Sequence, residues 1–443
     1  MATDTLPQPR VARAPWFKFL IVAALTIAMA VPLLFIQFAL SDREQTAAGA
    51  AQDIAAGWGG TQSVAGPVFV LPYTIPQVDQ TSGVELPHRQ VAVLLPETLA
   101  MKAATGEGTR SRGIFSVPVY RANIVMHATF DKAAMAALLP SGATPLWNEA
   151  RLAVIVSDAH GLADNVTLVV NGKGISAIPG SGLSNAPGVQ APLTMSAASD
   201  LTVDTNFTLR GSREFSFSPL GRRTTASIDS TWVSPSFFGA FLPTDRKVDA
   251  NGFTASWVVP YLARGFGQSF TANDQLADML RAPAFGARFY QPVDHYQLVE
   301  RALKYAILFI ALAFLVFFVV ETVSPRQLHV VHYALVGAAQ ALFYLLLLSF
   351  CEHIGFAAAY AVAAGATIGL TTLYAMSALA DRLRAGVLGA VLVVLYGLLY
   401  VILNAEDYAL VIGSCLLFAA LAATMYVTRK IDWFQLTGSA AAA

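Results

Sequence analysis

The chain has 443 residues, of which 55% are hydrophobic and 13% are charged. Soluble domains contain roughly 45–50% apolar and about 25% charged residues, so much of this chain is expected to lie in lipid. Its 28 basic and 28 acidic side chains cancel, and this absence of a net positive charge argues against a nucleic-acid partner. The two cysteines, Cys351 and Cys415, lie in apolar runs and supply no disulfide framework.

The first long apolar run covers residues 19–40 and ends at a polar Ser-Asp-Arg sequence. About 20 apolar residues in a helix cross the hydrocarbon core of a bilayer, so this run predicts transmembrane helix 1, preceded by a cytoplasmic segment at 1–18. The basic residues of that segment also fit the leader of a cleaved signal peptide. However, the run exceeds the ~7–15 residues of a signal-peptide core, which favours an uncleaved anchor.

Residues 41–300 contain no run long enough to span a membrane, and they alternate between apolar and polar residues as half-buried strands do. In residues 201–210, polar residues separate Leu201, Val203, Phe207 and Leu209. Further candidate strands lie at 68–71, 91–95, 124–130, 152–156, 166–170, 215–217, 226–232 and 253–259. Many short strands separated by turn residues predict an antiparallel β-sandwich-like domain.

Helix is expected only in short parts of this domain. Residues 42–56 are rich in alanine and would prolong helix 1 as a stalk, and residues 131–139 and 273–280 would each form two or three turns. Residues 177–191 are rich in Gly, Pro, Ser and Asn, which predicts a flexible loop.

The composition becomes apolar again after residue 300, which predicts a five-helix transmembrane bundle at 301–430. The expected spans are 305–320, 333–351, 354–380, 386–403 and 408–428. Basic residues gather on the side of the two termini, whereas the links at 352–353 and 404–407 contain neither Lys nor Arg. Because cytoplasmic loops are enriched in Lys and Arg, both termini, including the tail at 431–443, are expected in the cytoplasm and residues 41–300 in the periplasm.

The sequence contains no common catalytic motif, and nothing around His88, His127, His160 or His295 selects one as a base. No catalytic residue, cofactor site or metal site is therefore predicted. The interiors of the six expected spans also lack Asp, Glu and His, which argues against a proton-driven pump. Polar residues such as Gln340 are expected to form hydrogen bonds between helices.

The most distinctive polar feature is the Glu352-His353 pair in a very short link between two expected spans. This pair is a candidate site at the periplasmic membrane surface, where it would exchange a proton, bind a cation or a lipid headgroup, or dock the domain. The alternative is that the two side chains only keep the turn hydrated.

Two other patterns have simpler interpretations. Small residues spaced by four along one expected helix predict close helix packing rather than dimerisation or conduction. These residues are Ala357, Ala361, Gly365 and Gly369. His329 and His332 share a helix face, but two histidines without a carboxylate or thiolate make a weak metal site, and solvation at the interface is the preferred explanation.

Several stretches resemble the CreD family of bacterial inner-membrane proteins over residues 20–430. In the apolar half they are LHVVHYALVG at 328–337, YLLLLSFCEHIGF at 344–356 and ATIGL at 366–370. In the polar half they are GWGGTQ at 57–62, AGP at 65–67, RGIFSVPVY at 112–120, SPSF at 234–237, FLP at 241–243 and YQPVDHYQL at 290–298. Trp58, Gly66, Pro67, Glu352, His353 and Gly355 match the family pattern, whereas His332 stands where that pattern has glutamine.

The resemblance implies an inner-membrane protein of a Gram-negative bacterium that supports envelope integrity and tolerance to colicins and β-lactams under two-component control. It implies no catalytic reaction. The expected partners are membrane lipid and an envelope component bound by the periplasmic domain. Two other functions remain open from the residues: a transporter or flippase-like protein for an envelope precursor, and a membrane-bound periplasmic hydrolase.

Overall fold

The computed structural model describes residues 15–78, 85–271, 283–289, 295–322, 328–405 and 408–429. The chain divides into a helical unit, formed by Met1–Thr46 with Val293–Ala443, and a β domain at Ala47–Pro292. The predicted helix at 273–280, the tail at 431–443 and most of the segment at 1–18 lie outside the described residues.

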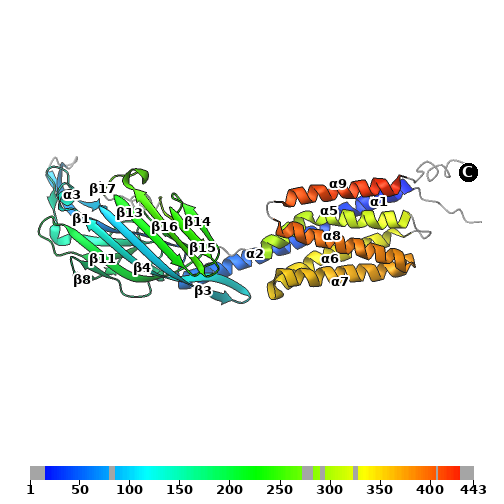
Figure 1. Cartoon of the computed structure of the whole chain (residues 1–443). Coiled ribbons are helices and arrows are strands. Elements are labelled where there is room, and N and C mark those ends of the chain that lie inside the picture. Colours follow the sequence, from blue (N-terminus) through cyan, green and yellow to red (C-terminus); the bar gives the residue numbers. More distant parts are fainter. Residues whose placement is uncertain are drawn as a thin grey trace, which may run out of the picture. The chain divides into compact units, whose positions relative to one another are not determined.

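The β domain contains two sheets (Figure 1). The first sheet has the order β14-β18-β12-β1-β6-β10-β9, and β2 and β5 pair with β1 while β17 pairs with β2. Its strands are β1 Gln62–Val78, β2 Glu85–Leu94, β5 Thr144–Pro145, β6 Arg151–Val156, β9 Ile178–Pro179, β10 Gly188–Pro192, β12 Glu214–Phe217, β14 Pro235–Gly239, β17 Ser269–Thr271 and β18 Phe285–Phe289. β12 runs parallel to β1 and antiparallel to β18. The first residues of β1 and the last residues of β18 therefore lie at the same end of these neighbouring strands.

The second sheet has the order β15-β16-β13-β3-β4-β11-β7-β8. Its strands are β3 Thr98–Arg112, β4 Phe115–Phe130, β7 Thr167–Val170, β8 Lys173–Ser176, β11 Leu201–Ser212, β13 Arg223–Ser230, β15 Asp245–Asp249 and β16 Gly252–Pro260. All pairs in this sheet are antiparallel except β13 with β3. The predicted antiparallel arrangement is therefore correct for most pairs, and each sheet adds one parallel pair.

Side chains from both sheets form a single hydrophobic core. Aromatic rings make contacts between the sheets. The ring centroids of Phe69 in β1 and Phe130 in β4 lie 6.4 Å apart, and those of Trp257 in β16 and Phe285 in β18 lie 5.3 Å apart. Burial of one such ring stabilises a fold by about 1.5–3 kcal/mol, so these contacts hold the two sheets together. The domain is thus a β-sandwich.

The alternation in β11 explains how the sequence defines this core. Leu201, Val203, Phe207 and Leu209 are buried, whereas the polar residues at 202, 204 and 206 are exposed. Period-two patterns place one set of side chains on the core face, as the sequence predicts. The sequence did not predict β3, because the second half of this strand is polar and projects beyond the core.

The predicted flexible loop at 177–191 is wrong in part. The strands β9 and β10 occupy its two ends and extend the first sheet beyond β6. Gly188 allows this approach, since a Cβ there would lie 2.1 Å from the carbonyl oxygen of Val154. Glycine and proline are compatible with edge strands, so a loop-like composition concealed the pairing.

The described helices of the helical unit lie side by side (Figure 1). They are α1 Pro15–Ala28, the apolar part of α2 Ala30–Trp58, α5 His295–Thr322, α6 Val330–Ile354, α7 Phe356–Leu379, α8 Arg382–Asn404 and α9 Ala409–Thr428. A short helix, α3 Lys132–Ala136, lies in the β domain within the predicted 131–139. The helix α5 begins at His295 rather than at the expected residue 305.

The first apolar run forms two helices instead of one, because the helix is interrupted at Met29. Pro32 lies three residues later and has no N–H to donate to the carbonyl of Ala28. Its ring also crowds that carbonyl, which explains why the interruption falls here. Beyond it, α2 continues to Trp58 and includes the predicted stalk.

The two turns on either side of α7 are very short. Gly355 alone separates α6 from α7, and its φ of 77° lies in a region that favours glycine. At the other end, Asp381 caps α8 by accepting hydrogen bonds from the N–H groups of Leu383 and Arg384.

Five described helices are long and apolar enough to cross a membrane. They are the stretch 20–58, which takes in most of α1 and all of α2 and counts here as one span, and the helices α5, α6, α7 and α8, while a shorter apolar helix covers 411–426. The structure therefore has a large β-sheet domain between apolar helices at both ends of the chain.

Candidate functional site

Glu352, near the end of α6, lies in a polar cluster of the helical unit, and its side chain is only 9% exposed. Its Oε1 accepts a hydrogen bond of 2.9 Å from the hydroxyl of Tyr296 at the start of α5. Arg43 of α2 adds its guanidinium Nε at 3.9 Å from the same oxygen. The three residues, which we call the Glu352 cluster, thus connect three helices.

His353 lies in a different environment, because successive residues in a helix point about 100° apart. Its side chain is exposed. The structure therefore separates the two members of the predicted pair: Glu352 is held by two partners, and His353 is directed to the surface. Since Glu352 is nearly buried, hydration of the turn does not describe its environment.

A second carboxylate, Glu321, lies at the end of α5 and was not identified from the sequence. It is buried and accepts hydrogen bonds of 2.7 Å from the N–H of Leu328 and from the hydroxyl of Tyr333. A small pocket beside it is lined by Ile21, Val22, Glu321, Leu328, Val330 and Tyr333. The lining of this pocket is predominantly apolar. The two hydrogen bonds of Glu321 to residues at the start of α6 indicate that this carboxylate joins α5 to α6.

His329 and His332 do not act together. His329 caps α6 by accepting a hydrogen bond from the N–H of Val331, whereas Nδ1 of His332 lies 2.6 Å from the hydroxyl of Tyr374 in α7. Within the described ranges, no group of three or more His, Cys, Asp or Glu side chains could hold a metal ion. Gln340 makes the predicted bond between helices, since its Oε1 accepts a hydrogen bond from Tyr396 of α8.

The stripe of small residues on α7 faces away from the interior of the bundle. Ala357, Ala361 and Gly365 are exposed, and an added Cβ at Gly365 or Gly369 would meet nothing within 4 Å. The buried face of α7 instead includes Ala359, Ala363 and Thr367. Among the described residues, no other helix therefore packs closely against the stripe. Its predicted packing role would require a partner other than the described residues of this chain.

In the β domain, Gln62 at the start of β1 organises the GWGGTQ segment and is almost completely buried. Its amide nitrogen donates to the carbonyl oxygens of Asp158 and Arg210, each at 3.0 Å, and its amide oxygen accepts from the N–H of Asp158 at 3.2 Å. One side chain thereby joins β1, the loop after β6 and β11. No pattern in the sequence around Gln62 indicates this role, because its partners are 96 and 148 residues away in the chain.

Asp158 strengthens the same junction. Its carboxylate accepts hydrogen bonds from the N–H of Gly60 and from the backbone and ring nitrogens of His160. Burial raises the pKa of this carboxyl, but the hydrogen bonds from Gly60 and His160 together hold it below its usual range. Asp158 is therefore ionised and acts as an acceptor at neutral pH.

The other histidines singled out in the sequence are not gathered into one site. His127 is exposed on β4, and its Nδ1 lies 2.7 Å from Oδ1 of Asp204 on β11. His88 is an exposed residue of β2, and His295 is the first residue of α5.

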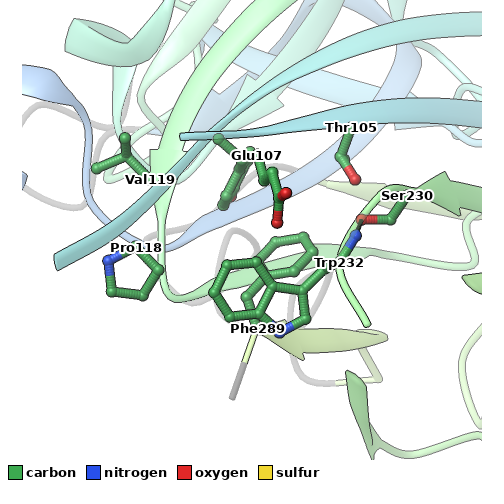
Figure 2. Close-up of a pocket in the computed structure, with 8 residues that line it drawn as sticks. Thr105, Glu107, Pro118, Val119, Ser230, Trp232 and Phe289 are labelled. Carbon is green, nitrogen blue, oxygen red and sulfur yellow. Dashed lines mark hydrogen bonds between the residues drawn. The ribbon is translucent and has the colours of Figure 1, made fainter. Parts of the chain in front are cut away.

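A small pocket lies in the β domain between strands of the two sheets (Figure 2). Figure 2 shows Glu107 pointing toward the rings of Trp232 and Phe289, whose centroids are 5.9 Å apart. The hydroxyls of Thr105 and Ser230 already bond to the backbone of this domain. The pocket is thus mainly an aromatic packing space, with Glu107 at its polar side.

The likeness to known proteins extends over both units. The family model described as inner membrane protein CreD matches residues 14–434. This chain belongs to the CreD family. Inner membrane protein CreD of Escherichia coli (strain K12) is 32% identical to it over 414 residues, which are 92% of this chain and 91% of that protein. With its apolar helices, this CreD-family chain is a multi-pass inner-membrane protein that contacts membrane lipid.

The family-like residues have identifiable structural roles. Gly355 makes the turn between α6 and α7, and Glu352 joins three helices. Gly66 has a φ of 117°, and a Cβ there would lie 2.9 Å from the carbonyl oxygen of Ala153. It falls where the register of β1 against β6 shifts, so Gly66 and Pro67 form an irregularity in the central strand.

Proposed function

We propose that this protein supports the integrity of the cell envelope by presenting its β domain to an envelope component. One observation carries the proposal: a β-sandwich of more than two hundred residues, Ala47–Pro292, is inserted in the chain between apolar helices. Such an arrangement retains a folded binding domain at the membrane. In this proposal residues 41–300 are periplasmic, six helices span the membrane, and both termini are cytoplasmic.

The Glu352 cluster is the polar site that we propose to be required for this function. A nearly buried carboxylate with a tyrosine and an arginine partner is costly to place beside apolar helices, and such groups often serve function. Because it connects α2, α5 and α6, the cluster would hold the helices on both sides of the inserted domain in one arrangement. His353, exposed beside it, is the second member of the proposed site.

Complementation of a strain that lacks the gene tests the proposal. The readout is survival with an envelope-directed agent, and membrane abundance is matched by immunoblotting. Wild type should restore tolerance, and Glu352→Gln with His353→Ala should not. Glu300→Gln is the control, because Glu300 is a more exposed carboxylate of α5 that pairs with Lys304. Full rescue by the double variant would exclude a functional role of the site.

Reporter fusions test the proposed topology separately. Alkaline phosphatase, which is active only after export, should be active when fused at Gly211 or Asn404. Green fluorescent protein fused after residue 429 should fluoresce, because this end is placed in the cytoplasm. A cytoplasmic location for either exported position would contradict the proposed function.

A further inference from the structure

Three arginines surround one aromatic ring in the β domain. The ring is Trp58 at the end of α2, and the guanidinium carbons of Arg110, Arg121 and Arg210 lie 4.3, 5.6 and 5.3 Å from its centroid. They come from β3, β4 and β11, which are neighbouring strands of the second sheet. We call these three residues the arginine cluster.

Within the described part of the chain, no ion pair balances the positive charge of the arginine cluster. Arg121 and Arg210 are direct partners in the pairing of β4 with β11, an arrangement in which like charges destabilise a sheet. Asp53 pairs with Arg112 instead, and Asp158 bonds to Gly60 and His160. Across the described segments, no carboxylate lies within ion-pair distance of the cluster.

The backbone beneath the cluster is held firmly in place. The carbonyl of Arg210 accepts the hydrogen bond from Gln62, and its Nη2 donates to the carbonyl of His160 at 3.4 Å. A Cβ at Gly59 or Gly161 would lie within 2.5 Å of the carbonyl oxygen of Arg210, so close backbone packing fixes this position. A binding group on a supported backbone loses little freedom when a ligand binds.

The ring is fixed as well, because Nε1 of Trp58 donates to the carbonyl oxygen of Tyr120 at 3.4 Å. The Nε of Arg210 is shielded from solvent and has no hydrogen-bond partner among the described residues. A shielded donor without a partner is unfavourable, and a bound ion is one of the arrangements that would satisfy it. Repelling charges on a fixed frame therefore indicate a site organised for an anion.

We propose that the arginine cluster binds a phosphate group. Guanidinium groups donate paired hydrogen bonds to phosphate oxygens, and several of them match the charge of a phosphate better than that of a single carboxylate. This inference rests on the proposed function, in which the β domain binds an envelope component, and it names the chemical group that the domain would bind. The phosphate belongs either to a soluble anion or to the headgroup of an anionic lipid.

Binding is measured on the full chain in nanodiscs of phosphatidylcholine, with inorganic pyrophosphate as the probe in isothermal titration calorimetry. Wild type should bind, with an affinity that falls as salt rises. Arg121→Gln should bind roughly tenfold or more weakly, because it removes charge-assisted hydrogen bonds. Lys102→Gln is the matched control, since Lys102 is an exposed cation on the same strand as Arg110.

Thermal unfolding without pyrophosphate separates a binding site from a structural anchor. If the cluster is built for an anion, Arg121→Gln removes repulsion and should unfold at the same or a higher temperature than wild type. If the three arginines only hold Trp58 by cation–π contacts, the variant should unfold at a lower temperature. Absence of pyrophosphate binding by wild type would overturn the proposal, and a lower unfolding temperature of Arg121→Gln would then assign the three arginines to holding Trp58.

A lipid arm identifies the source of the phosphate. Nanodiscs containing phosphatidylglycerol should weaken pyrophosphate binding to wild type, but not the residual binding of Arg121→Gln, if the headgroup occupies the cluster. Equal binding in both nanodiscs supports a soluble anion. If wild type binds pyrophosphate in neither nanodisc, both sources of phosphate, the soluble anion and the lipid headgroup, are excluded. Because no cells are used, lost envelope complementation with intact binding would count only against the proposed function.

Discussion

The hydroxyl of Tyr296 in α5 lies 2.9 Å from Oε1 of Glu352 in α6. Since Arg43 of α2 approaches the same oxygen, one carboxylate links the helix before the β domain, the helix after it and a third helix. A charge in this position is stable only while its partners remain, so the Glu352 cluster couples the positions of these helices.

Tyr296→Phe should lower the free energy of unfolding by about 1–2 kcal/mol, because it removes a hydrogen bond to a charged group. The measurement is thermal or denaturant unfolding of the full chain in detergent. Tyr305→Phe is the control, because Tyr305 lies on the same helix and its hydroxyl has no hydrogen bond to a described residue. Equal losses in the two variants would mean that the bond to Glu352 does not stabilise the helices.

Gly337→Ala should destabilise the helical unit by about 1–3 kcal/mol through overpacking. A Cβ at this position would lie 2.7 Å from Cζ of Phe314 and 2.8 Å from Sδ of Met29. Gly397→Ala is the control, since nothing lies within 4 Å of a Cβ there. Both substitutions gain about 1 kcal/mol of helix propensity, so the comparison between the two variants isolates the overpacking. Equal stability of Gly337→Ala and Gly397→Ala on unfolding in detergent would contradict the close packing of α5 and α6 at Gly337.

Gln62→Ala should lower the stability of the β domain by about 2–4 kcal/mol, because three hydrogen bonds are lost and their backbone partners stay buried. The control is Gln77→Ala, in which an exposed glutamine of the same strand is changed. Protease resistance of the domain in the full chain reports the difference. Equal resistance of both variants to digestion would show that Gln62 is dispensable for the junction of β1 with β11.

Asp158→Asn should reduce stability at neutral pH by about 1 kcal/mol or less, since a quarter of the side-chain surface of Asp158 is exposed. The pKa of Asp158 is lower in the folded chain than in the unfolded chain, so its contribution is full above the unfolded pKa of about 4. The contribution disappears as the pH falls through the folded pKa. The difference between wild type and variant should therefore vanish in acid.

Asp164→Asn serves as the control for this pH profile, because Asp164 is exposed and forms no ion pair with a described residue. Its unfolding profile should follow that of wild type from neutral pH to acid. A deficit of Asp158→Asn that persists below the folded pKa would show that the hydrogen bonds of Asp158 do not depend on its charge.

Local patterns in the sequence were sufficient to predict the apolar helices and the alternating strands. The core positions of β11 follow from a two-residue period, and the helix ends differ from the predicted ends by only a few residues except at the interruption at Met29 and at the start of α5. The additional turns of α5 carry Tyr296 and Glu300, whose polarity kept this segment outside the predicted span. Packing against the bundle, rather than composition, makes it helical.

The polar clusters depend on tertiary pairing and could not be predicted in this way. Glu352 was singled out, but its partners Arg43 and Tyr296 are distant in sequence. The arginine cluster requires the register that places Arg121 opposite Arg210. A net charge of zero gave no indication of it, because compensating acidic residues lie elsewhere in the chain.

The position of β18 determines when the β domain becomes complete during synthesis. This strand comes last in the domain but lies between β12 and β14, and β12 in turn pairs with β1. Until residues 285–289 have been made, β12 and β14 each expose an unpaired edge, and such edges readily pair with other chains. A nascent chain truncated before Phe285 should therefore be sensitive to proteases and aggregation, even though most of its strands are present.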